Sequence, residues 1–304
     1  MTVDPRAPLA HLATEAADPR FAGIDRMSVA DLAATMNDAD ASVPRAVGRA
    51  LPEISAAIEA AAARMKAGGR LVYVGAGTPG RLGVLDASEC PPTYGTSPEQ
   101  VFGIIAGGPS ALLSACEGAE DDEDAAAAAI DDAGVGPLDT VLGIASSGRT
   151  PFVIAAVRHA RGLGALTVGL SCNAGTPLSE AAEHPIEVLV GPEVVSGSTR
   201  LKAGTAQKLV LNMFSTIIMV QLGKTYGNLM VDVKPTNDKL RERAVRIVRA
   251  ITGAARPEAV AALSANDHNV KQAVVALRLG VSPAEAAARL AAGGGRLRDA
   301  LGEA

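Results

Sequence analysis

Short apolar runs rich in β-branched residues recur along the chain from Leu71 onward, and most of them lead into a glycine-containing turn and a helical pattern. Runs of this length are typical of strands that are buried on both faces of a sheet. Regular alternation of strands and helices predicts an α/β fold, with a doubly wound, mostly parallel sheet covered by helices on both faces. We expect strands at Leu71–Val74, Val101–Ile105, Thr140–Ala145, Ala165–Leu170 and Ile186–Val190.

The regions on either side of this sheet are predicted to be helical. Residues 1–27 contain several prolines and resemble an extended arm, and Ser28 with Asp31 forms a variant capping box that begins a helix. Apolar positions from Val47 to Met65 fall on one helical face. Beyond the sheet region we expect short amphipathic helices at Lys239–Thr252, Pro257–Ala265, Val270–Leu279, Pro283–Ala291 and Leu297–Leu301. The sequence thus predicts an N-terminal arm with helices over residues 1–55, a sheet domain over 56–224, and a linker with a small helical bundle over 225–304.

Prolines are expected to shape two connections between strands. The helix after the first strand is predicted to end at Glu89–Pro92, because proline cannot continue a helix without losing a hydrogen bond. After the second strand, Pro109 is expected to begin a helix that carries Leu112, Leu113 and Cys116.

Composition and charge narrow the classes of function. The net charge of the 304 residues is −5, and no basic block is present, so nucleic acid is not an expected partner. No apolar run approaches the roughly 18 residues of a membrane span, and the first twenty residues lack the apolar core of a signal peptide. We therefore expect a cytoplasmic protein that is not bound to a membrane. The three cysteines form no CxxC pair and the four histidines have no metal-ligand spacing, so reduced thiols and no metal are expected.

The loop after the third predicted strand is a candidate anion site. Ser146, Ser147, Gly148 and Thr150 precede Pro151, which is expected to be the first residue of a helix. The free N–H groups and the dipole of a helix N-terminus favour phosphate there. The same residue types also serve ordinary helix capping, so the pattern by itself leaves both interpretations open.

Two other turns add candidate binding residues. Gly77 and Thr78 lie in the glycine turn between the first strand and its helix, a typical place for a site at the carboxyl end of a parallel strand. Ser198, Thr199 and Lys202 stand before a long helix predicted over roughly 201–222. Their polar groups are suited either to an oxyanion or to a capping network.

Two carboxylates lie at the ends of short apolar elements, and we select them as the candidates for chemistry. Glu89 comes near the end of the helix after the first strand, and Glu120 begins an acidic run that extends to Asp124. Residue type alone favours surface or capping roles for both. For Asp121–Asp124 a solvated helix start is the simpler interpretation, because acids are stabilised near the positive end of the helix dipole.

Longer segments resemble one family, the N-acetylmuramic acid 6-phosphate etherases. The resemblance extends over nearly the whole chain from about Arg20, and DASECPPT and STRLKAGTAQK are its most specific parts. The matching segments are GAGTPGRLGVLDASECPPTYG, IIAGG, EGAEDD, GIASSGRTPFVIAAVRHAR, GLSCN, GPEVVSGSTRLKAGTAQKLVLNM and YGNLMVDVKPTN.

The resemblance implies both a fold and an activity. It implies a sugar isomerase (SIS) domain that binds phosphosugars, a homodimer, and no cofactor. The implied reaction converts N-acetylmuramic acid 6-phosphate into N-acetylglucosamine 6-phosphate and D-lactate, during recovery of peptidoglycan sugars. By resemblance, Glu89 is the proton donor and general acid/base, and Glu120 is a second catalytic carboxylate.

The chain departs from the family pattern at two positions. Pro79 replaces a serine that is usual in the first loop, and Ser146 replaces an alanine that is usual in the loop after the third strand.

Two other functions are compatible with the same kind of domain. An aldose–ketose isomerase would use the same phosphate loops without releasing lactate. A non-catalytic sensor of sugar phosphates would resemble the glucokinase regulatory protein, but the presence of both Glu89 and Glu120 argues against it.

Overall fold

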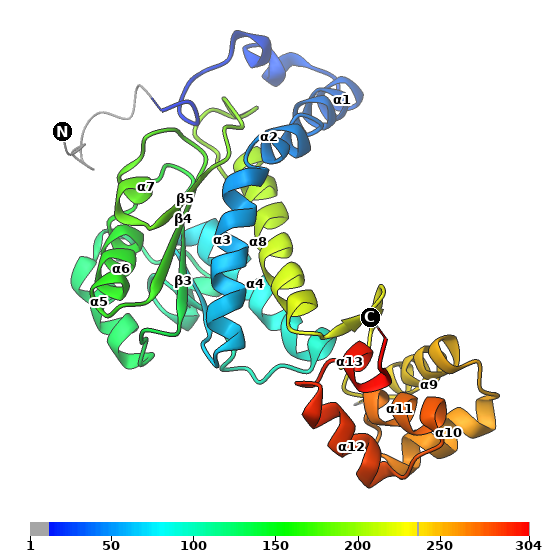
Figure 1. Cartoon of the computed structure of the whole chain (residues 1–304). Coiled ribbons are helices and arrows are strands. Elements are labelled where there is room, and N and C mark those ends of the chain that lie inside the picture. Colours follow the sequence, from blue (N-terminus) through cyan, green and yellow to red (C-terminus); the bar gives the residue numbers. More distant parts are fainter. Residues whose placement is uncertain (1–11, 236, 304) are drawn as a thin grey trace. The chain divides into compact units, whose positions relative to one another are not determined.

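The computed structural model describes residues 12–235 and 237–303 (Figure 1). Its contacts divide the chain into two compact units. The first contains the described residues up to Ser88 together with Pro98–Ser215, and the second contains Glu89–Ser97 and the chain from Thr216 on. The contacts group the described N-terminal helices with the sheet, and the division between the units falls within a long helix, at Ser215 and Thr216. The first part of the predicted arm, residues 1–11, lies outside the described residues.

The centre of the first unit is a five-stranded sheet in which all pairs are parallel. Its order is β2-β1-β3-β4-β5, so the chain leaves β1 toward one edge and then returns to the other side of it. The point of reversal lies between β1 and β3, where sheets of this type bind their ligands. The strands are β1 (Leu71–Gly75), β2 (Val101–Ile105), β3 (Thr140–Ile144), β4 (Leu166–Ser171) and β5 (His184–Glu187).

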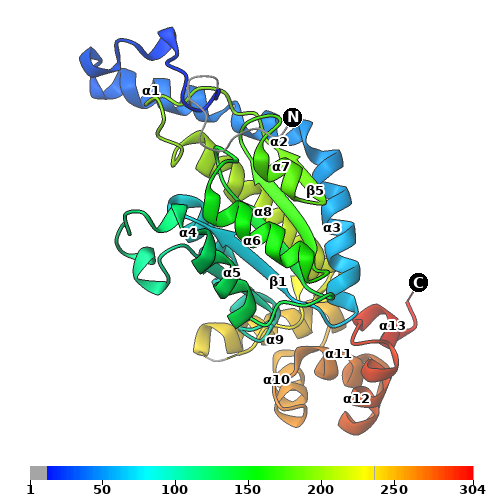
Figure 2. The same ribbon diagram turned by 90° about the vertical axis from the view of Figure 1, so that its left-hand side faces the viewer.

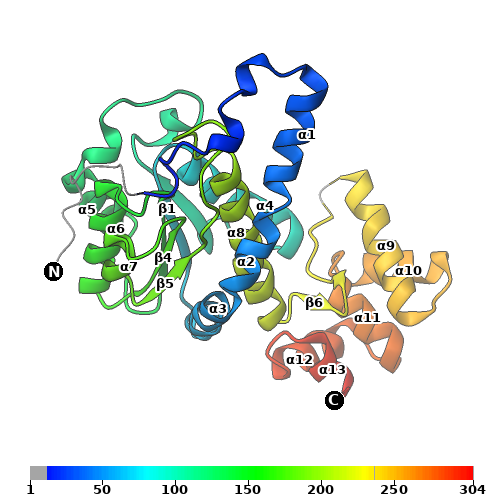
Figure 3. The ribbon, with the colours of Figure 1, turned by 90° about the horizontal axis from the view of Figure 1, so that it is seen from above.

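Helices cover both faces of this sheet, as the sequence predicts. Helices α5, α6 and α7 lie on one face, and α3, α4 and α8 lie on the other (Figures 1 and 3). Figure 2 views the first of these faces, with α5, α6 and α7 in front of the strands. The helices of this region are α1 (Val29–Asp40), α2 (Val43–Arg49), α3 (Leu51–Lys66), α4 (Gly77–Tyr94), α5 (Glu123–Asp132), α6 (Pro151–Gly162), α7 (Pro177–Ala181) and α8 (Lys202–Gln221).

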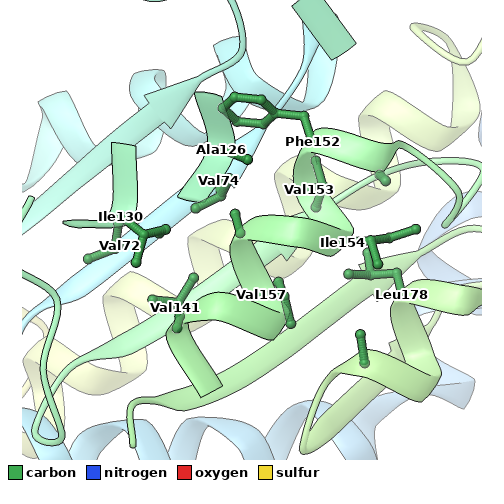
Figure 4. Packing of buried hydrophobic residues seen from close by; sticks show 14 of the residues in the cluster. Val72, Val74, Ala126, Ile130, Val141, Phe152, Val153, Ile154, Val157 and Leu178 are labelled. Atoms are coloured by element: carbon green, nitrogen blue, oxygen red, sulfur yellow. The ribbon is translucent and has the colours of Figure 1, made fainter. Parts of the chain in front are cut away.

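Aliphatic side chains build the core between the sheet and the layer formed by α5, α6 and α7. With aromatic residues at only 2% of the chain, valine, leucine, isoleucine and alanine fill most of the space (Figure 4). Removing this apolar area from water is the main favourable contribution to the folding free energy. The side chains labelled in the figure are Val72, Val74, Ala126, Ile130, Val141, Phe152, Val153, Ile154, Val157 and Leu178.

On the opposite face, a buried carboxylate links α4 to α8. Asp86 of α4 accepts hydrogen bonds from the Tyr73 hydroxyl (2.7 Å), the Asn212 amide (2.7 Å) and the Ser215 hydroxyl (3.2 Å). Burial raises the pKa of Asp86 above its usual value, while these hydrogen bonds act in the opposite direction. The contacts hold the helix that follows the first strand in a defined position.

Three predicted elements differ from the structure. Helix α4 continues through Pro91 and Pro92 to Tyr94, where the Gly95 N–H donates to the Pro91 carbonyl (3.0 Å). Burial of Cys90 and Tyr94 stabilises this last turn despite the two missing N–H donors. The other two differences concern the helix expected after Pro109 and the last strand of the sheet.

The predicted helix after Pro109 is only a 3-10 turn that ends at Leu112, and the exposed Leu113 contributes nothing to the core. The last strand of the sheet lies earlier than predicted, because its partner β4 ends at Ser171, which pairs with Glu187.

The second unit has a core of its own, as predicted for a separate helical bundle. A short hairpin of β6 and β7 precedes five helices whose bounds agree with the predicted ones to within a residue or two. The elements are β6 (Thr225–Tyr226), β7 (Leu229–Met230), α9 (Asp238–Thr252), α10 (Arg256–Ala265), α11 (Val270–Leu279), α12 (Pro283–Ala292) and α13 (Leu297–Leu301).

Within the described part of the chain, α8 alone is long and apolar enough to pass a length-and-composition test for a membrane span. The core helix of a globular protein passes the same test. In α8 the side chains of Ala203, Val210, Phe214 and Ile218 are fully buried. Burial within the protein therefore accounts for a large part of its apolar character.

Close packing between β3 and α6 leads to a prediction about stability. A Cβ atom added to Gly143 would lie 2.5 Å from Val157 Cγ2 and 2.9 Å from Val153 Cγ1. We expect Gly143→Ala to lower the free energy of unfolding by about 1–3 kcal/mol, the usual cost of overpacking a core. Urea denaturation followed by circular dichroism would measure it.

Gly162→Ala, at the end of α6, is the matched control, because no atom lies within 4 Å of its added Cβ. It should be neutral or slightly stabilising. Equal losses of stability in the two variants would contradict this account of the packing.

Candidate functional site

A large cavity, of about 820 Å³, lies at the carboxyl ends of β1 and β3, where the strand order reverses. The residues that follow both strands form much of its wall. The remaining wall comes from a turn before α5, from the segment before α8 and from the N-terminal segment. The lining residues are Glu15, Ala76, Gly77, Thr78, Pro79, Glu120, Asp121, Ser146, Ser147, Arg149, Thr150, Pro151 and Thr199.

The fold brings most of the predicted site residues together in this cavity. Those that line it are Gly77, Thr78, Glu120, Ser146, Ser147, Thr150 and Thr199. Four others, Glu89, Gly148, Ser198 and Lys202, are not among the lining residues. Gly148 lies within the loop after β3 that lines the cavity, whereas Glu89 lies near the other end of α4.

Gly148 gives the loop after β3 its shape. Its φ of +68° is in the left-handed region, and an added Cβ would lie 2.4 Å from the Thr176 side chain. Its N–H donates to the Ala145 carbonyl (2.9 Å), and its carbonyl accepts from the Leu178 N–H (3.0 Å). The loop is therefore held closely between β3 and α7, and only glycine fits at this position.

The N-terminus of α6 opens onto the cavity. Thr150 is the N-cap residue, yet its side chain makes no capping hydrogen bond, and Pro151 stands at the first helical position. Ordinary capping therefore does not account for the Thr150 hydroxyl, which leaves it for a ligand. A helix N-terminus with a free hydroxyl suits an oxyanion.

Arg149 supplies positive charge beside this helix end. Its side chain is buried and also lines the cavity, and among the described lining residues it is the basic one. Its backbone N–H donates to the Ser147 hydroxyl (3.2 Å). The hydroxyl of Ser146 accepts a hydrogen bond from Gln207 (2.9 Å), so this departure from the family pattern is integrated into the hydrogen bonding of the site.

The polar stretch before α8 divides into capping and lining residues. Buried Glu193 accepts hydrogen bonds from the backbone N–H groups of Lys202 and Ala203 (both 2.9 Å), and the Lys202 ammonium donates to the Val190 carbonyl (2.8 Å). Burial raises the pKa of Glu193 and lowers that of Lys202. Lys202 thus forms part of the helix start, while Thr199 faces the cavity.

Glu120 lies at a boundary between two cavities. It belongs to a 3-10 turn, Ala119–Asp121, that follows Gly118 in a left-handed conformation. A smaller cavity of about 240 Å³ shares Ala76, Gly77 and Glu120 with the large one. The carboxylate is therefore placed to contact a ligand in the large cavity.

Glu89 is not among the residues that line either of the two cavities that Glu120 borders. It is exposed on α4, whose first residue, Gly77, lines the cavity. At about 1.5 Å per residue, Glu89 lies roughly 18 Å along the helix axis from that end.

Glu15 was missed by the sequence reasoning. It lines the large cavity, although it belongs to the segment predicted as an arm. Its local sequence contains no periodicity or motif that points to a site. Among the residues described, no group of three or more histidine, cysteine, aspartate and glutamate side chains is arranged to hold a metal ion.

Two family models match the chain. A model of the SIS domain matches residues 122–217, and a model of the glucokinase regulatory protein N-terminal SIS domain matches residues 53–161. Among solved structures, a phosphoheptose isomerase from Francisella tularensis is 20% identical, with a TM-score of 0.47 over 63% of this chain and 98% of that one.

Curated proteins show much higher similarity. The chain is 57% identical to the N-acetylmuramic acid 6-phosphate etherase of Streptomyces coelicolor over 99% of this chain and 97% of that protein. The etherase of Rubrobacter xylanophilus is 58% identical, with 97% of each chain covered. That of Escherichia coli O17:K52:H18 is 51% identical over 96% of this chain and 98% of the relative.

The reactivity of the Cys172 thiol tests the burial of this residue, which follows β4. Burial, and then the nearby charge of Glu193, raises the pKa of the Cys172 thiol to about 12. At pH 8 Cys172 should stay protonated and resist iodoacetamide, whereas partly exposed Cys116 should react first. Mass spectrometry of peptides from native and denatured protein would measure this, with Cys116→Ser as the control. Equal labelling of both thiols in the native protein would contradict the burial of Cys172.

Proposed function

The chain belongs to the N-acetylmuramic acid 6-phosphate etherase family, and on that premise we propose that its large cavity binds N-acetylmuramic acid 6-phosphate. The enzyme is a carbon–oxygen lyase. It cleaves the D-lactyl ether and yields N-acetylglucosamine 6-phosphate and D-lactate, in the recycling of peptidoglycan amino sugars. The observation that carries the proposal is the meeting of an anion-binding loop and Glu120 in one cavity.

The phosphate binds at the N-terminus of α6. Ser147 and Thr150 supply hydroxyl groups, Gly148 shapes the loop, and Arg149 supplies positive charge. The helix dipole adds to the attraction for a dianion. Thr78 and Thr199, which line other parts of the cavity, are the residues we propose for contact with the sugar.

The chemistry follows from the position of the ether in the open-chain sugar. The aldehyde at carbon 1 acidifies the hydrogen on carbon 2, and the lactyl ether is on carbon 3. Removal of that proton allows elimination of lactate, and water then adds to the unsaturated aldehyde. The route needs a base for carbon 2, an acid for the departing oxygen and a base for water. Carboxylates in different environments can share these tasks without a cofactor.

Glu120 is the catalytic carboxylate that the chain itself contributes to the cavity. Glu89, expected from the family resemblance to be the proton donor, lies roughly 18 Å along α4 from the helix end that lines the cavity. We assign the protein as a homodimer in which Glu89 of the partner subunit completes the site. Exposure of Glu89 in the single chain agrees with this arrangement.

The two other functions are not favoured. An isomerase and a sensor would both bind a phosphosugar in this cavity, but the relatives at 51–58% identity carry the etherase name over almost the whole chain. A cytoplasmic location forms part of the proposal, because the three cysteines are free.

Release of D-lactate from N-acetylmuramic acid 6-phosphate tests the reaction directly. The wild-type protein should release D-lactate, and Glu120→Gln should slow turnover by about 100-fold or more, the scale of one acid–base group. An enzymatic lactate assay measures both. Absence of lactate, with binding of the phosphosugar retained, would overturn the etherase assignment.

Mixed dimers test whether Glu89 acts across the subunits. Glu89→Gln and Glu120→Gln should each be nearly inactive, but co-expression should restore about a quarter of wild-type activity, because half of the dimers are mixed and each has one intact site. If Glu89 and Glu120 of the same chain act together, no mixed dimer has an intact site and activity stays low. Melting temperatures of the single variants would show that both are folded.

A further inference from the structure

The N-terminal segment is attached to the walls of the large cavity by Thr14, which is completely buried. The Thr14 N–H donates to Asn173 Oδ1 (3.4 Å), and Asn173 Nδ2 donates to the Thr14 hydroxyl (3.1 Å). The same Asn173 amide also donates to the Ser146 carbonyl (3.0 Å). The segment is thereby connected to the loop after β3, which lines the cavity.

A second set of contacts joins this segment to the loop before α8. The Gly197 N–H donates to the Thr14 carbonyl (3.2 Å), and the Ser196 hydroxyl donates to the Glu15 carbonyl (2.8 Å). These contacts and those of Asn173 involve Thr14 and the backbone of Glu15. The carboxylate of Glu15 is not needed for the attachment.

The Glu15 side chain instead lines the cavity. Within the described residues its carboxylate has no hydrogen bond or ion pair. A Cβ atom added to Gly197 would lie 2.9 Å from Glu15 Oε2, so glycine leaves the space that this side chain occupies. A half-buried carboxylate held beside a cavity by its backbone is free to accept hydrogen bonds from a ligand.

The charge of Glu15 restricts the part of the ligand that it can contact. A carboxylate repels a phosphate group, which is served by Arg149 and the N-terminus of α6. A carboxylate accepts hydrogen bonds strongly from neutral O–H and N–H donors. In an N-acetylated phosphosugar these donors are the ring or chain hydroxyls and the acetamido N–H.

We infer that Glu15 is a substrate-binding residue, which accepts hydrogen bonds from the hydroxyl or acetamido groups of the sugar. The inference rests on the proposed function for the identity of that sugar. It gives the N-terminal segment a direct role in recognition. Recognition of the sugar then depends partly on a residue that precedes the first strand of the sheet by more than fifty positions. Recognition of the phosphate does not.

Calorimetric titration of the full-length protein with N-acetylglucosamine 6-phosphate and, separately, with inorganic phosphate tests the inference. Glu15→Gln keeps the shape of the side chain and removes its charge. It should weaken binding of the phosphosugar by about 10-fold or more, because a neutral amide oxygen accepts hydrogen bonds less strongly than a carboxylate and the amide NH2 cannot accept them. Binding of inorganic phosphate should be unchanged or tighter. In lactate-release assays, KM should rise while kcat changes by less than about 3-fold.

Two comparison variants separate recognition from structural effects. Ser147→Ala should weaken both ligands, because it removes a hydroxyl proposed to contact phosphate. Asp25→Asn removes an exposed carboxylate from the same N-terminal segment and should change neither affinity nor activity.

Several results would overturn the inference. Equal weakening of both ligands in Glu15→Gln would indicate a structural role, and a fall in kcat with unchanged KM would indicate a catalytic one. Unchanged affinity for the phosphosugar, or no binding of it by the wild type, would also reject it. If the wild type binds the phosphosugar but releases no lactate, the proposed reaction fails, while the titrations still decide the role of Glu15.

Discussion

Parallel pairing of β1 with β3 is the constraint on which the site depends. Because Gly75 pairs with Ile144, the two strands end at the same level, and the loops that follow them open into one cavity. The arrangement also requires the backbone at Gly75 to lie close to the backbone at Gly80. A Cβ on Gly75 would lie 2.5 Å from the Gly80 nitrogen, so the turn into α4 closes only around glycine. The loop after β3, the glycine turn and Glu120 line one cavity as a result of this topology.

The polar groups of the cavity are separated by charge. Arg149 and the N-terminus of α6 form a region suited to an anion, whereas Glu15, Glu120 and Asp121 bring negative charge to other walls. Such a distribution suits a ligand with a phosphate at one end and neutral hydrogen-bond donors elsewhere. It also orients the ligand, because a phosphate placed beside the carboxylates would be repelled.

The different positions of the two glutamates proposed for catalysis have a simple geometric origin. Glu120 reaches the cavity on a short turn, while Glu89 lies several helical turns from the end of α4 that touches the cavity. A rigid helix can present its far end to a second subunit but not to its own cavity. The proposed dimer uses this rigidity, and Asp86, whose hydrogen bonds hold α4 to α8, helps to set the direction of the helix.

The sequence by itself determined the elements whose signals are local. The buried strands, the start of α6 at Pro151 and the C-terminal helices follow from short patterns of apolar, glycine and capping residues, and the structure confirms these elements. Long-range packing decided the rest. Continuation of α4 through Pro91 and Pro92 depends on burial of Cys90 and Tyr94, which no local pattern reveals. The place of Glu15 beside the cavity depends on Thr14 meeting Asn173, 159 positions away, and such a contact exists only once the sheet has assembled.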